Sequence, residues 1–216
     1  GYLRGVGVNY STQANYEARK GHHDKAMELA FESLKILEKH GNPGDLGTPL
    51  TTIAIIHMRE GNLDQAEKFL LQALDNPKHD QDSTSSASVL NNLGLVHFQK
   101  KEYERAIQYF RRTLKLDSLS GNRSGMSTTY SNLAISYKNL EQYDEAMKYN
   151  TLSLEMDREL HSPRGVAASM NNIGSLLIRQ GQYQRAIDTF LIGLEIATKI
   201  DDKVIMKDFV ANLSDA

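Results

Sequence analysis

This 216-residue sequence contains no cysteine and no long apolar run, and each absence excludes a class of function. Without cysteine the chain has no disulfide framework, no thiolate zinc site and no thiol nucleophile. That composition is compatible with oxidising and with reducing compartments. No apolar run approaches the roughly 20 residues that a membrane-spanning helix needs. The first ten residues also lack the charged start and apolar stretch of a signal peptide.

The sequence also lacks an excess of charge of one sign. Its 25 Lys and Arg and 27 Asp and Glu leave a formal net charge of −2. There is therefore no global basic field of the kind that attracts nucleic acid or anionic lipid, and we expect neither nucleic acid nor direct membrane insertion. Hydrophobic residues make up 40% of the chain, which is enough to bury a core in a protein of this length.

A period of 40 residues organises the whole chain: NNLGLVHFQKKEYERAIQYF at 91–110 returns as NNIGSLLIRQGQYQRAIDTF at 171–190. One column of the repeat holds only alanine, namely Ala26, Ala66, Ala106, Ala146 and Ala186. Another column holds only small residues, namely Ala14, Ala54, Gly94, Ala134 and Gly174. Small residues at a fixed spacing predict close contact between helices. We expect the large residues three positions before each alanine to fill the space, namely His23, Leu63, Tyr103, Tyr143 and Tyr183.

Each unit is predicted to be a pair of helices, because apolar residues recur at three- and four-residue steps in both of its halves. The turn between the halves holds Gly21, Gly61 and Gly181, which is typical of a left-handed residue at a helix end. Lys101 and Glu141 replace glycine in the other two units. Aspartates that follow this turn are expected to be N-caps or first-turn carboxylates of the second helix, namely Asp24, Asp64 and Asp144.

The predicted helices follow from these periodicities. First helices are expected at Leu3–Lys20, Thr48–Glu60, Ser86–Lys100, Ser124–Leu140 and Pro163–Gln180. Second helices are expected at Asp24–Lys39, Asp64–Asn76, Glu104–Asp117, Asp144–Leu160 and Gln184–Ile200, and a sixth first helix is expected to begin near Lys203. The polar connector Pro77–Ser85 has no apolar anchor and is expected to be mobile.

The predicted fold is all-α, a single solenoid over residues 1–216 in which each helical hairpin packs on its neighbours. The repeats are expected at about 7–46, 47–86, 87–126, 127–166 and 167–206, with the start of a sixth at 207–216. A lone first helix would expose its apolar face, so we expect the native protein to continue beyond Ala216.

These columns resemble the tetratricopeptide repeat (TPR) family over nearly the whole chain. The resemblance rests on a leucine or isoleucine followed by a small residue, then tyrosine, alanine and phenylalanine, as in Leu93, Gly94, Tyr103, Ala106 and Phe110. It implies a right-handed superhelical solenoid of antiparallel helix pairs, whose first helices line a concave groove. The usual TPR unit has roughly 34 residues. The longer unit resembles kinesin light chains, cell-polarity adaptors and the sensory domains of bacterial signalling proteins, and the connectors resemble the bacterial group most.

The column before the leucine or isoleucine is polar throughout, with Thr12, Thr52, Asn92, Asn132, Asn172 and Asn212. In TPR proteins, asparagines in this column commonly bond the backbone of an extended peptide, since a carboxamide offers both a donor and an acceptor. The resemblance therefore implies a peptide-binding set of Asn91, Asn92, Asn132, Asn171 and Asn172. The alternative is that these asparagines cap or bridge neighbouring helices.

Arg19, Arg59 and Arg179 share a column near the end of the first helix. They would favour acidic side chains at the edge of the groove, or else they would serve as the cations that a helix C-terminus favours. The basic clamp for a terminal carboxylate found in chaperone adaptors is not supported. The corresponding positions are Ser11, Thr51, Asn91, Ser131 and Asn171.

No catalytic motif was found in the sequence. The stretch RGVGVNY at 4–10 lacks the third glycine and the lysine of phosphate-binding loops. His22, His23 and Asp24 are adjacent at a helix end, where their side chains diverge, so a surface turn is favoured over a metal site. We therefore expect no enzyme activity, no cofactor and no metal.

Two functions from different classes remain open. The first is an interaction module whose groove binds a peptide or a partner segment, with the input domain of a bacterial signalling protein as one setting. The second is a structural spacer or assembly scaffold without a groove ligand, which self-associates through its exposed C-terminal end. Localisation is not determined, because the first setting implies the bacterial periplasm and other settings the cytoplasm.

Overall fold

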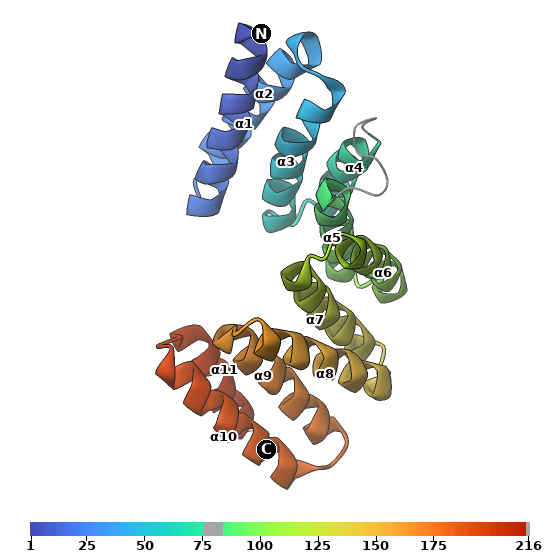
Figure 1. Cartoon of the computed structure of the whole chain (residues 1–216), viewed down its shortest axis with the longest axis vertical. Helices are drawn as coiled ribbons and strands as arrows, with labels where there is room; N and C mark the ends of the chain where they lie inside the picture. Colours follow the sequence, from blue (N-terminus) through green and yellow to red (C-terminus); the bar gives the residue numbers. More distant parts are fainter. Residues whose placement is uncertain (76–83, 215–216) are drawn as a thin grey trace. The chain divides into compact units, whose positions relative to one another are not determined.

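The computed structural model describes residues 1–75 and 84–214, and this part of the chain is all-α, with no strand. Its helices are α1 (Tyr2–Lys20), α2 (His23–His40), α3 (Gly47–Arg59), α4 (Leu63–Leu74), α5 (Thr84–Gln99), α6 (Tyr103–Leu119), α7 (Arg123–Asn139), α8 (Tyr143–Glu159), α9 (Pro163–Arg179), α10 (Tyr183–Lys199) and α11 (Lys203–Ser214), with a 3-10 turn η1 (Pro43–Leu46) before α3 (Figure 1). The predicted bounds agree with these to within a few residues. The expected helix end at Asn76 and most of the connector Pro77–Ser85 lie outside the described residues.

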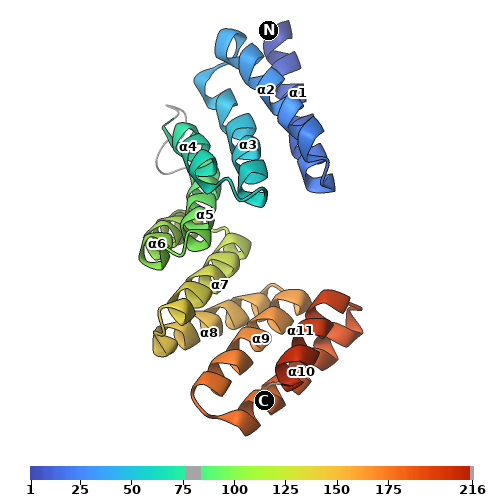
Figure 2. The same cartoon turned by 180° about the vertical axis from the view of Figure 1, so that it is seen from behind.

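The chain divides into two compact units, Gly1–Leu116 and Asp117–Ala216. In the first unit α1 pairs with α2 and α3 with α4, and in the second unit α7 pairs with α8 and α9 with α10 (Figures 1 and 2). The first helices of successive hairpins also contact one another, α1 with α3 and α3 with α5, and α7 with α9 and α9 with α11. We call these helices the first-helix layer of each unit. The prediction that residues 1–216 form a single solenoid remains a prediction.

The alanine column is fully buried, at 0% exposure in all five repeats. The large side chains that fill the space beside the small column are not the ones expected from the sequence. A Cβ atom added to Gly94 would collide with the ring of Phe110, and one added to Gly174 would collide with Phe190. Tyr183 is instead 54% exposed, because it is the first residue of α10 and lies at the turn of the hairpin. The phenylalanine one turn after the alanine faces the partner helix and packs against the glycine.

Hairpin turns adopt the left-handed backbone expected from the glycines. Gly21, Gly61 and Gly181 have φ values of 86°, 79° and 73°. Lys101 and Glu141, which replace glycine, adopt the same conformation with φ values of 62° and 59°. Asp24, Asp64 and Asp144 are first-turn carboxylates, since the N-cap positions belong to the residues two before them.

In the second unit, the side chains of Asp117 and Asp157 bind polar residues of neighbouring helices. The Asp157 carboxylate accepts hydrogen bonds from Ser127 and Ser169, at 2.5 and 3.2 Å. The Asp117 carboxylate accepts one from the Asn122 side chain at 2.8 Å, and burial raises the pKa of Asp117. Asp157 of α8 is therefore bonded to both α7 and α9, and Asp117 is bonded to Asn122, the N-cap residue of α7.

Candidate functional site

The second unit contains a cavity of about 730 Å³ at the C-terminal ends of its first helices. We call it the α7–α9–α11 cavity. Its walls come from the last turns of α7 and α9, from α11, and from the first residues of α8 and α10. The lining residues are Lys138, Asn139, Glu141, Tyr143, Ser175, Ile178, Arg179, Tyr183 and Asn212. The cavity therefore lies on the layer of helices that the family resemblance expected to face a ligand.

Two cations, Lys138 and Arg179, line this cavity. Burial lowers the pKa of the Lys138 ammonium group, and the positive charge of Arg179 lowers it further. Glu141 also lines the cavity. Among residues 1–75 and 84–214, no carboxylate lies within ion-pairing distance of either cation. The cavity thus has a net positive charge that the described part of the protein does not neutralise.

The predicted asparagines lie on first helices of both units. In the second unit, Asn132 on α7 and Asn172 on α9 are half-buried. Asn171 accepts a hydrogen bond at its Oδ1 from Nδ2 of Asn212, at 2.8 Å, so it bridges α9 and α11. Such a bridge is the alternative that the sequence left open. In the first unit Asn91 and Asn92 are half-buried on α5. Peptide binding by all five remains a prediction.

The three arginines of this column, Arg19, Arg59 and Arg179, have different surroundings in the structure. Arg59 donates from Nη1 to the carbonyl oxygen of Ala18 at 2.8 Å, at the C-terminal end of α1, where the same oxygen also accepts from the Gly21 N–H. That is the helix-end role considered in the sequence analysis. Arg19 and Arg179 are both exposed in the last turns of their helices, and Arg179 also lines the cavity. Only Arg179 is therefore placed to meet a ligand in the α7–α9–α11 cavity.

Sequence reasoning missed Lys138 as a site residue. Its column in the repeat holds Ala18, Met58, Phe98, Lys138 and Ile178. A cation in a column that is otherwise apolar is the signal that would have identified it.

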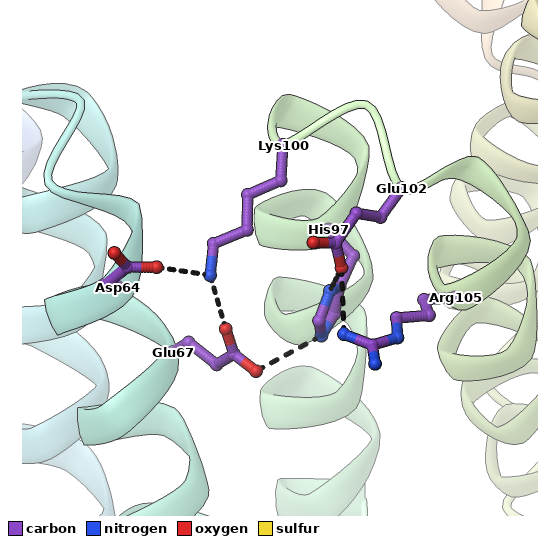
Figure 3. A network of polar contacts seen from close by, with 6 residues as sticks. All are labelled: Asp64, Glu67, His97, Lys100, Glu102 and Arg105. Carbon is purple, nitrogen blue, oxygen red and sulfur yellow. Dashed lines mark hydrogen bonds and ion pairs between the residues drawn. The ribbon is translucent and has the colours of Figure 1, made fainter.

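A polar network in the first unit links α4, α5 and α6, and Figure 3 shows its six residues. Lys100, just after α5, contacts Asp64 and Glu67 of α4 at 2.6 and 2.5 Å. His97 is 1% exposed, and its Nδ1 lies 2.8 Å from Glu102, which also pairs with Arg105. Hydrogen bonds from these partners lower the pKa values of Asp64 and Glu102. Burial opposes the charge of Lys100, but the bonds to Asp64 and Glu67 outweigh it and raise the Lys100 pKa.

The environment of His97 favours a packing role. Its ring stacks on Tyr109 with centroids 5.1 Å apart, as His57 stacks on Phe69 and Tyr137 on Tyr149. A ring stack at one position of three successive repeats is what a structural column predicts. Among the described residues, no group of three or more His, Cys, Asp or Glu side chains is placed to hold a metal ion. In the same part of the chain, no helix has the length and apolar character needed to span a membrane.

The fold and the cavity define a helical-repeat protein with a cationic recess on its first-helix layer. A family model described as tetratricopeptide repeat matches residues 45–119 and 125–199, so the chain belongs to the tetratricopeptide repeat family. Repeats of this family are generally non-catalytic scaffolds for protein interaction, which indicates a protein or peptide as the partner. A search of curated protein sequences gave no match.

Several solved structures share the fold at low sequence identity. BtubC (BKLC) from P. vanneervenii is 23% identical, with a TM-score of 0.80, over 91% of this chain and 83% of that chain. The apo form of RapI is 18% identical, with a TM-score of 0.85, over 94% and 74%. A Rap protein complexed with Competence and Sporulation Factor is 15% identical, with a TM-score of 0.78, over 93% and 56%.

Proposed function

We propose that this protein is an interaction module whose second unit binds an extended polypeptide segment along its first-helix layer. The single observation that carries the proposal is the cavity of about 730 Å³, lined by polar and aromatic side chains at the ends of α7 and α9. A large and mainly polar recess on a repeat scaffold suits a main chain, which needs hydrogen-bond partners along its whole length. The Rap protein complexed with Competence and Sporulation Factor has the same fold and binds a partner, which supports the proposal that this protein also binds one.

Neither Asn132 nor Asn172 lines the cavity, so in this proposal the segment extends from the cavity along α7 and α9, where both asparagines bond its backbone. They occupy the same position of successive first helices, α7 and α9, and both are half-buried. Their spacing by one repeat suits a chain that runs across the two helices. We assign the same role to Asn91 and Asn92 in the first unit. Asn171 contributes through its bridge to Asn212, which holds α11 beside α9.

The test is to select binders from phage-displayed random dodecapeptides on the immobilised protein, and to measure the best synthetic peptide by calorimetry. Neutral hydrogen bonds contribute about 0.5–1.5 kcal/mol each, so Asn132→Ala with Asn172→Ala is expected to weaken binding by about 1–3 kcal/mol if the effects add. The matched control is Gln184→Ala, an exposed amide on the second-helix side in α10, which is expected to bind as the wild type does.

The outcomes separate the two functions that the sequence left open. If no peptide is enriched over a blank support, the groove has no peptide ligand, and the spacer or scaffold alternative replaces this proposal. If enriched peptides bind the double variant as tightly as the wild type, Asn132 and Asn172 do not contact the bound peptide. A bacterial signalling setting remains part of the proposal and requires an identified natural partner.

A further inference from the structure

Three of the neutral polar side chains that line the α7–α9–α11 cavity already donate hydrogen bonds within the protein. The Ser175 hydroxyl donates to the carbonyl oxygen of Asn171 at 3.0 Å, and Nδ2 of Asn139 donates to the carbonyl oxygen of Ile135 at 2.8 Å. Asn212 donates from Nδ2 to Asn171. The strongest donors left for a ligand are the Lys138 ammonium and Arg179 guanidinium groups, neither of which pairs with a carboxylate in the described part of the chain.

Holding these two cations in one cavity opposes folding. Burial of the Lys138 ammonium group lowers its pKa, and repulsion from the exposed Arg179 lowers it further. Both cations lie in the last turns of their helices, where the helix dipole favours positive charge, but the dipole does not remove the cost of burying the Lys138 ammonium group. Lys138 stands where the other repeats have an apolar residue. Attraction to a bound anion would offset both the burial of Lys138 and its repulsion from Arg179.

We infer that the cavity selects polypeptide segments with an acidic side chain, whose carboxylate is held between Lys138 and Arg179. The inference rests on the proposed function and adds the chemistry of the partner. A guanidinium binds a carboxylate through two parallel N–H bonds, and an ammonium adds a compact charge from the neighbouring helix. Asp or Glu in the segment therefore decides specificity, while the asparagines bond the main chain of any sequence.

The experiment uses the dodecapeptide selected above, acetylated and amidated so that its only carboxylates are side chains. Selected peptides are expected to be enriched in Asp and Glu at one position, and the Glu→Gln counterpart is expected to bind the wild type about tenfold more weakly. On Lys138→Met/Arg179→Met, the Glu and Gln peptides are expected to bind within twofold of each other. Because the Lys138 charge opposes folding, this variant is expected to melt no earlier than the wild type.

The matched control is Lys207→Met/Arg158→Met, which removes the same charge from exposed positions outside the cavity. It is expected to retain the tenfold preference for Glu. In a second variant, Lys138→Glu/Arg179→Glu, a peptide with Lys at the selected position is expected to bind more tightly than the Glu peptide. Such a reversal requires direct contact and would not follow from a change in net charge alone.

Four results would overturn the inference. One such result is a set of selected peptides that is not enriched in Asp or Glu. Another is a preference for Glu that persists in the Lys138→Met/Arg179→Met variant. Either result would leave peptide binding supported and would show that Lys138 and Arg179 do not select an acidic side chain. If a peptide whose only carboxylate is a free C-terminus binds as tightly as the Glu peptide, the cavity recognises a C-terminal carboxylate and not an acidic side chain. Failure to select any peptide would remove the proposed function together with the inference.

Discussion

At the scale of single residues, the hairpin turns show how one backbone conformation is served by different side chains. Gly21, Gly61 and Gly181 adopt left-handed φ values without steric cost, because glycine has no Cβ. Lys101 and Glu141 adopt the same conformation with a Cβ, which is unfavourable for L-residues. The surrounding hairpin therefore imposes these two turns against the local preference of the residue.

Lys101→Gly is accordingly expected to raise the free energy of unfolding by about 0.5–1 kcal/mol, measured by urea denaturation. The gain from relieving the left-handed strain exceeds the extra entropy that glycine has in the unfolded chain. The control is Lys115→Gly in the interior of α6, which is exposed and helical and should lose about 0.5–1 kcal/mol. Equal losses at both positions would show that the Lys101 turn is not strained.

At the scale of helices, the contact between first and second helices depends on the matched size of two columns. Where the small column has glycine, at Gly94 and Gly174, the facing residue is the phenylalanine one turn after the alanine. Where it has alanine, as at Ala54, the corresponding position holds the smaller Leu70, and both are fully buried in one hydrophobic cluster. Close packing requires this compensation, since protein interiors leave little free volume.

Gly174→Ala is expected to destabilise the protein by about 1–3 kcal/mol, because the added methyl group meets the fully buried ring of Phe190. Gly174→Ala/Phe190→Leu recreates the pair found at Ala54 and Leu70 and should recover part of that loss. Gly5→Ala is the control, since a Cβ at this exposed helical glycine has no neighbour within 4 Å. It should stabilise the protein by about 0.5–1 kcal/mol. Destabilisation by Gly5→Ala of similar size would refute the steric explanation.

At the scale of the whole molecule, exposed ion pairs make stability depend on pH. Hydrogen bonds from cationic partners lower the pKa values of four carboxylates, namely Glu17, Asp64, Glu102 and Glu195. A carboxylate with a lowered pKa in the folded state adds stability above its unfolded pKa, near 4, and loses it as the pH falls through the folded value. Asp117 has the opposite effect on the pH dependence of stability, because burial raises its pKa in the folded state.

We therefore expect the melting temperature to fall as the pH is lowered from about 5 toward 3, because the four lowered carboxylates outnumber Asp117. Since these pairs are largely exposed, the acid-induced loss should shrink in 0.5 M salt, which screens surface charges. Circular dichroism melts at several pH values, with and without salt, measure both effects. A melting temperature that rises over this range would show that the buried aspartate dominates.

The sequence alone was sufficient for the all-α class, the 40-residue repeat and the helix bounds, because these follow from local periodicity and turn residues. Gly181 and the start of α9 at Pro163 are examples, since each depends only on residues within one turn of the chain. The predicted burial of the alanine column also followed from the repeat and is confirmed at 0% exposure.

Only the tertiary structure decided which side chains meet. It placed Phe190 rather than Tyr183 against Gly174, and it brought Lys138 and Arg179, which belong to different repeats, into one cavity. It also separated Arg59, which binds a carbonyl of α1, from Arg179, although both occupy the same column. The physical reason is that periodicity fixes the face of a helix on which a residue lies. The partner on that face depends on packing between helices, both within one hairpin, as for Gly174 and Phe190, and between successive repeats, as for Ala18 and Arg59.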